Sequence, residues 1–65
     1  MLYSLRSIRK QRDMTQEQLA KAANINRVTI AKYETLKVDA TTENAEKIAE
    51  VLGVTVNDLL IKEVG

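Results

Sequence analysis

The sequence predicts an all-α fold in which five short helices surround one small core. Apolar residues recur every three or four positions in several short segments, which is the period of an amphipathic helix, and no segment alternates for long enough to indicate a strand. The 65-residue chain has no proline and only two glycines, and residues that cap helix starts separate the segments. A chain of this length suits one domain, which we expect over residues 1–65 with its core in residues 5–60.

The first two predicted helices are separated by a break at Asp13. The first helix ends near Arg12 and has one apolar face, made of Leu2, Leu5 and Ile8. Thr15 begins the second helix, because its hydroxyl can accept an amide hydrogen bond and Gln18 follows three residues later, as in a capping box. This helix ends at Asn24, a residue that tolerates the left-handed conformation. Its expected buried stripe is Leu19, Ala22 and Ala23.

The third predicted helix follows after a link of only three residues, 24–26. Asn26 is its N-cap candidate, and the helix runs through Glu34. So short a link forces a large crossing angle, which predicts a helix-turn-helix. Such a crossing needs a small residue between the helices, which Ala20 provides, and apolar residues at the shared core positions. The residues at those positions are Leu19, Ala23, Ile25, Ile30 and Tyr33.

Two more helices complete the predicted domain. Thr41 or Thr42 caps the fourth helix, which ends at Gly53. Its apolar face consists of Ala45, Ile48, Ala49 and Leu52. Thr55 begins a short fifth helix that extends to about Lys62.

The composition excludes several classes of function. The chain has neither cysteine nor histidine, which removes thiolate and imidazole metal sites and the usual nucleophile pairs. A chain of 65 residues is also too small to enclose a substrate pocket, so we expect no enzyme activity, no metal, no cofactor and no small-molecule ligand. Residues 1–12 contain no continuous apolar run, so we expect no signal peptide or membrane span and a cytoplasmic location.

The charge is unevenly distributed along the chain. Residues 1–37 contain eight basic and three acidic side chains, whereas residues 38–65 contain two basic and six acidic ones. A basic half beside an acidic half favours one surface that binds a polyanion. The alternative is chance unevenness on a solvated surface.

Four segments together resemble the Cro-like (XRE) family of phage and bacterial repressors. The segments are LRSIR at 5–9, MTQEQLA at 14–20, INRVTIAKYE at 25–34 and IAEVLGV at 48–54. The resemblance extends over residues 5–60. It implies a compact five-helix, lambda-repressor-like domain whose third helix, residues 26–34, enters the major groove. It also implies a bacterial or phage transcription regulator, a repressor or autoregulator, that binds double-stranded DNA.

The resemblance also assigns roles to single residues. Gln16 matches a position that hydrogen-bonds a phosphate and braces the base-reading side chains. Thr29 matches a position near the DNA backbone, and Lys37 a loop position that contacts phosphate. Arg9 and Glu34 match a partly buried ion pair between the first and third helices. The base-reading positions match Asn26, Arg27, Val28 and Lys32.

The chemistry of these side chains suits base recognition. Arg27 can form two hydrogen bonds to guanine, and Val28 can pack against a thymine methyl. Lys32 can bind guanine or a phosphate. Asn26 can bind adenine, or serve only as a helix cap. Additional backbone contacts are expected from Lys10 and Arg12, whose alternative role is that of ordinary solvated charges.

Three positions depart from the family pattern. Asn24 replaces the usual glycine of the turn and is expected to keep the turn. Leu36 replaces a frequent glycine, and because leucine is costly at positive φ, we expect the loop to follow a different path or the third helix to end differently. Ala40 replaces a common proline, which should make the loop before the fourth helix less rigid.

One small domain offers few contacts, so we expect a homodimer on a pseudo-palindromic operator. The candidate interface residues are Leu60, Ile61 and Val64; alternatively, Leu60 covers the core and the rest is a frayed tail. A different class of function is a protein-interaction module, such as an antitoxin or a partner of another regulator, in which the acidic half docks a basic partner.

Overall fold

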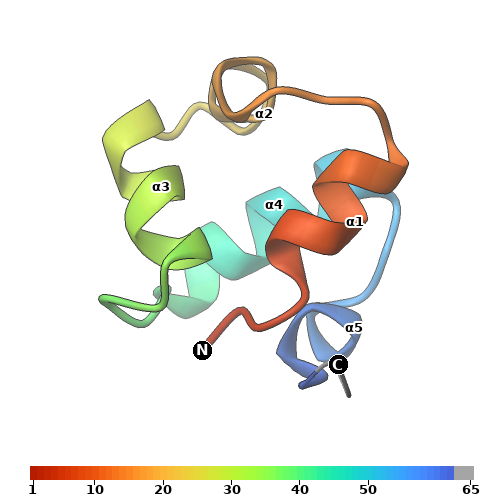
Figure 1. Ribbon diagram of the computed structural model, residues 1–65. Coiled ribbons are helices and arrows are strands. Elements are labelled where there is room, and N and C mark those ends of the chain that lie inside the picture. The colour runs from red at the N-terminus through yellow and green to blue at the C-terminus, as the bar shows by residue number, and fades with distance from the viewer. Residues whose placement is uncertain (63–65) are drawn as a thin grey trace.

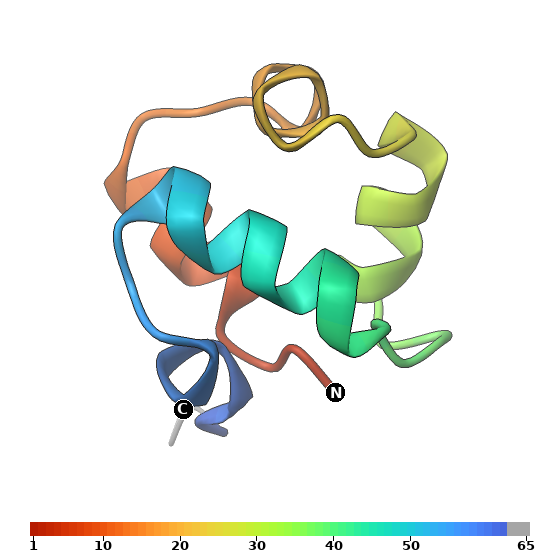
Figure 2. The same cartoon turned by 180° about the vertical axis from the view of Figure 1, so that it is seen from behind.

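The computed structural model describes residues 1–62, in which five α-helices and no strand are present. The helices are α1 (Leu5–Gln11), α2 (Gln16–Ala23), α3 (Arg27–Glu34), α4 (Thr42–Leu52) and α5 (Val56–Leu60). In Figure 1, α1 lies in front of α4, α3 flanks them, and α5 lies below, near the N-terminus. The reverse view in Figure 2 places α4 in front. The predicted all-α fold with five helices is therefore confirmed.

Local side-chain caps begin four of the five helices. The hydroxyls of Thr15, Thr41 and Thr55 and the side-chain oxygen of Asn26 each accept an amide hydrogen bond from the first turn. Thr41, the first of the two candidates, caps α4. These caps satisfy donors that an α-helix leaves without an internal partner, so the predicted starts of α2 to α5 are confirmed.

The two ends of the helical region differ from the prediction. Leu2 is buried but precedes α1, which begins at Leu5 and has no side-chain cap. The preceding segment is instead fastened to the other end of the chain, because the Ser4 amide donates to the Leu59 carbonyl oxygen at 3.0 Å. The fifth helix ends at Leu60 rather than near Lys62, since the backbone of Ile61 is extended.

Four helices are followed, within two residues of their last position, by a residue with left-handed backbone. These residues are Asp13 (φ 55°), Asn24 (φ 56°), Leu36 (φ 59°) and Gly53 (φ 71°). The expectation that Leu36 would redirect the loop or change the helix end is wrong. The Leu36 amide donates to Tyr33 O and the Lys37 amide to Lys32 O, which closes the helix in the usual left-handed manner. Leucine adopts this conformation at a cost of about 1–2 kcal/mol.

The core is built from one face of each helix. Its largest fully buried side chains are Leu5, Leu19, Ile30, Ile48 and Leu59. On α2 the buried small residues are Ala20 and Ala23, whereas Ala22, which was predicted to be buried, is exposed. Ile8 and Val54 are partly buried against this core. No helix within residues 1–62 is long and apolar enough to cross a membrane.

Candidate nucleic-acid interface

Helix α3 has one face in the core and the other in solvent. Ile30 and Tyr33 are buried, whereas Arg27, Val28 and Lys32 are exposed. Val28 is 54% exposed, which is high for a branched apolar side chain. In Figure 1, α2 is seen along its axis while α3 runs across that direction, at the edge of the molecule. The three exposed side chains are therefore available to a ligand that approaches α3 from outside.

The turn between α2 and α3 sets this orientation. Asn24 is left-handed, and the amide of the next residue, Ile25, donates to Ala20 O at 2.9 Å. Ile25 packs partly buried against the core. Asn26 then returns to extended backbone, and its side-chain oxygen accepts a 2.8 Å hydrogen bond from the Val28 amide. Asn26 is thus a helix cap, and its Oδ1 already has one partner.

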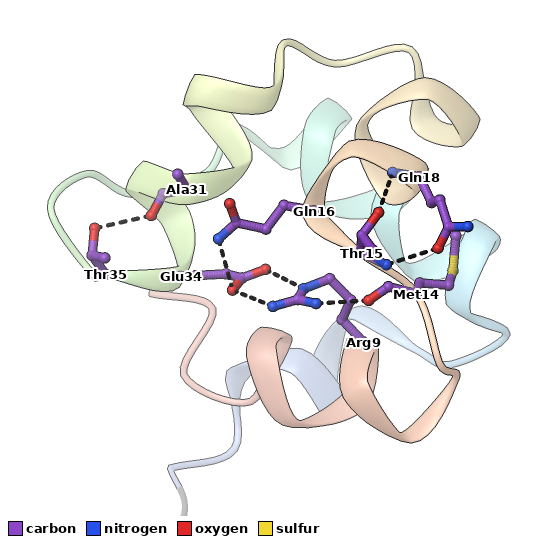
Figure 3. Close-up of polar contacts among 8 residues, drawn as sticks. All are labelled: Arg9, Met14, Thr15, Gln16, Gln18, Ala31, Glu34 and Thr35. Atoms are coloured by element: carbon purple, nitrogen blue, oxygen red, sulfur yellow. Dashed lines mark hydrogen bonds and ion pairs between the residues drawn. The ribbon is translucent and has the colours of Figure 1, made fainter.

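An ion pair between Arg9 and Glu34 fastens α3 to α1 (Figure 3). Arg9 Nε lies 2.6 Å from Glu34 Oε2, and Arg9 Nη2 donates to Glu34 Oε1 at 3.0 Å. Arg9 Nη1 donates to the Met14 carbonyl oxygen at 2.6 Å. The two side chains are only 10% and 3% exposed. The hydrogen bonds to Glu34 raise the pKa of Arg9 above its ordinary value. Burial of the guanidinium acts in the opposite direction, and the negative charge of Glu34 adds to the increase.

Gln16, the first residue of α2, joins the same network. Its Nε2 donates to Glu34 Oε1 at 3.2 Å, beside the capping box of Thr15 and Gln18 (Figure 3). A shallow hollow at the protein surface includes Gln16 and Arg27 in its lining, together with Arg9. The structure therefore brings together the start of α2 and the start of α3. The Glu17 carboxylate also lines this hollow, so the positive charge of Arg27 and of the helix N-termini is partly offset there.

The other residues predicted to contact phosphate are dispersed. Thr29 is partly buried on α3, Lys37 is exposed three residues after the end of α3, and Lys10 is exposed on α1. Arg12 points elsewhere, because its Nε donates to the Leu52 carbonyl oxygen at 3.0 Å. That carbonyl lies at the C-terminal end of α4, where a cation interacts favourably with the helix dipole. The structure therefore gives Arg12 a tertiary contact between α1 and α4.

The residues predicted for a dimer interface lie at the C-terminal end. Leu60 and Ile61 are 44% and 59% exposed, so Leu60 is not a core residue. Val64 lies outside the described residues. Within residues 1–62, no group of three or more carboxylate, thiol or imidazole side chains is arranged to hold a metal ion.

Sequence reasoning missed two contacts that position α3. Asn44 Nδ2 donates to Tyr33 Oη at 2.9 Å, which links α3 to α4. The Met14 carbonyl that receives Arg9 Nη1 is the other. The Asn44–Tyr33 contact leaves no local signal, because it joins residues of two different helices. The Arg9–Met14 contact spans only five residues, but it depends on the path of the turn that follows α1.

Comparison with known proteins agrees with this geometry. A family model described as helix-turn-helix matches residues 5–59. The chain belongs to the helix-turn-helix family of DNA-binding transcription regulators. It is also 38% identical over 63 residues to an uncharacterized HTH-type transcriptional regulator of Methanocaldococcus jannaschii, an alignment that covers 97% of this chain and 96% of the relative. The predicted resemblance and the helix-turn-helix fold are confirmed.

Proposed function

We propose that this helix-turn-helix protein binds double-stranded DNA sequence-specifically by placing α3 in the major groove. In this role it acts as a repressor or autoregulator of transcription. The observation that carries the proposal is the exposure of Arg27, Val28 and Lys32 on a helix whose opposite face is anchored in the core. An α-helix fits the major groove, in which each base pair displays a distinct pattern of donors and acceptors.

In this proposal the base-reading residues have unequal roles. Arg27 forms two hydrogen bonds to guanine O6 and N7, a contact that discriminates by about 1–3 kcal/mol. Val28 packs against a thymine methyl, which explains its high exposure. Lys32 binds a base or a phosphate through a single flexible ammonium. Asn26 first caps α3 through Oδ1, so its amide NH₂ is the group offered to a base.

Phosphate contacts would fix the position of α3 in the groove. We assign them to Gln16, Thr29, Lys37 and Lys10. Gln16 is supported by its place at the positive end of α2, and Lys37 and Lys10 by their exposure. Arg12 is left out of this set, because its guanidinium is bonded to the end of α4.

We further propose that residues 1–65 act as one domain and that two copies bind a pseudo-palindromic operator. The exposed pair Leu60 and Ile61 supports a two-fold contact at the C-terminal end. Sedimentation of the protein with and without duplex tests this point. Leu60→Ser with Ile61→Ser should shift any dimer to monomer, and an unchanged mass would place the interface elsewhere.

A titration of random-sequence duplex at several salt concentrations tests the DNA-binding proposal. We expect affinity to fall steeply, with a slope of log K against log salt of about −0.9 for each phosphate neutralised. A weak, salt-independent response would count against DNA binding. It would favour the protein-interaction module instead.

A further inference from the structure

A basic groove lies next to the proposed DNA-reading surface. It runs between α1, the C-terminal end of α3 and the segment that follows α5. Its lining residues are Tyr3, Arg6, Ser7, Lys10, Glu34, Leu36 and Lys62. The three cations among them are exposed and come from opposite ends of the chain. We call these seven residues the α1 groove.

The charge of the α1 groove is strongly positive. Among residues 1–62, Glu34 is the one carboxylate in its lining, and that carboxylate already accepts hydrogen bonds from Arg9 and Gln16. Its negative charge is therefore compensated by Arg9, outside the groove lining. Arg6, Lys10 and Lys62 remain as three cations on one open concave surface. Clustered cations of one sign attract an extended anion and raise its local concentration.

Specific contacts hold Lys62 at the groove. Its Nζ lies 5.3 Å from the centroid of the Tyr3 ring, which is within the range of a cation–π interaction. The backbone just before it is fastened to the N-terminal segment, because Ser4 donates to the carbonyl oxygens of both Leu59 and Ile61. The cation from the C-terminal end is thus placed beside the cations of α1 by tertiary structure.

Hydrogen bonds of Glu34 link the α1 groove to the surface assigned to DNA. Glu34 ends α3 and lines the groove, while its partners Arg9 and Gln16 line the hollow that also contains Arg27. The network of Figure 3 therefore joins the two surfaces. A duplex whose bases face α3 would carry its phosphates past the end of that helix, toward Leu36 and the three cations.

We propose that the α1 groove binds the phosphodiester backbone of DNA that flanks the bases contacted by α3. Arg6 and Lys62 are the new residues in this assignment, and Lys10 lies between them and the proposed reading surface. The proposal rests on the DNA-binding function proposed above and extends its footprint. The open shape suits a continuous polyanion, and the Ser7 hydroxyl adds a neutral donor for a phosphate oxygen.

The test compares salt dependence in charge-removing variants. Arg6→Ala and Lys62→Ala should each make the slope of log K against log salt shallower by about 0.9 on a long duplex. A fourfold rise in salt would then weaken each variant about 3.5-fold less than the unaltered protein. Base preference should stay unchanged, because backbone contacts carry no sequence information. Arg6→Lys, which keeps the charge, should retain the original slope.

Lys47→Ala is the matched control, since it removes one cation of α4 that lines a different hollow, together with residues of α2. Its slope should equal that of the unaltered protein. A duplex trimmed to the bases that α3 contacts provides a second arm. There the double variant of Arg6→Ala with Lys62→Ala should bind as tightly as the unaltered protein, because the flanking phosphates are gone.

The proposal is overturned if the double variant, with helical circular dichroism intact, keeps the original slope on the long duplex. The proposal is also overturned if the double variant loses the same amount of affinity on the long duplex as on the trimmed duplex. An acidic peptide that binds the unaltered protein but not the double variant, with DNA binding unchanged, would assign the groove to a protein partner. Failure of the unaltered protein to bind any duplex would instead refute the DNA-binding function itself.

Discussion

Replacing Glu34 with alanine should lower the free energy of unfolding by about 3–5 kcal/mol, because a buried cation then loses its partner. The Arg9 side chain is 10% exposed, so water cannot fully replace the carboxylate. The substitution removes two hydrogen bonds from the guanidinium, to Glu34 Oε1 and Oε2, and leaves the one to the Met14 carbonyl oxygen. Two charge-assisted bonds at about 1.5–3 kcal/mol each agree with that range.

Urea denaturation followed by circular dichroism measures this loss. A small domain of this length is stable by roughly 3–10 kcal/mol, so Glu34→Ala could leave much of the population unfolded at 25 °C. Arg9→Met combined with Glu34→Leu is the informative control, because it removes both charges. The double variant should lose much less stability than the sum of its single substitutions. A loss below about 1 kcal/mol for Glu34→Ala, or a double variant as unstable as that sum, would refute the reasoning.

Three further predictions concern single residues. Thr15→Ala removes the cap that accepts from the Gln18 amide and should cost about 0.5–2 kcal/mol in urea denaturation; no change would mean that water replaces the cap. Gly53→Ala should cost about 1–2 kcal/mol because of the positive φ alone, since an added Cβ meets nothing within 4 Å; a stabilised variant would contradict this. Hydrogen bonds from the Thr55 amide and then its hydroxyl lower the pKa of Asp58 below its ordinary value of 3.8. The stability that this adds is present above pH 3.8 and is lost as the pH falls through the lower pKa of the folded protein. Asp58→Asn should therefore remove this part of the acid dependence of unfolding. An identical dependence of stability on pH in the variant would contradict the prediction.

The parts of the fold that sequence predicts are those with local causes. Thr15, Asn26 and Thr55 mark helix starts because a side chain caps amides only two or three residues away. The turn at Asn24 is equally local. Ala22 was wrongly predicted to be buried, because alanine is small enough to occur on either the buried or the exposed face of a helix.

Tertiary contacts explain what sequence could not predict. Leu36 takes a left-handed conformation that its own preference opposes, because the hydrogen bonds that close α3 require it. Arg12 has the positive charge expected of a DNA contact, but its hydrogen-bond partner, the carbonyl oxygen of Leu52, is 40 residues away in the sequence. The exposure of Arg27 and Val28, by contrast, follows from helix periodicity alone once Ile30 and Tyr33 are placed in the core.

The central claim is that the outer face of α3 contacts bases, and Arg27→Ala tests it most directly. Sequences bound by the unaltered protein and by the variant would be selected from a random duplex pool and compared. The account predicts that the variant keeps its fold and its affinity for random duplex but loses a guanine preference of about 1–3 kcal/mol at one position of each half-site. An identical selected motif, bound equally tightly by the folded variant, would contradict it.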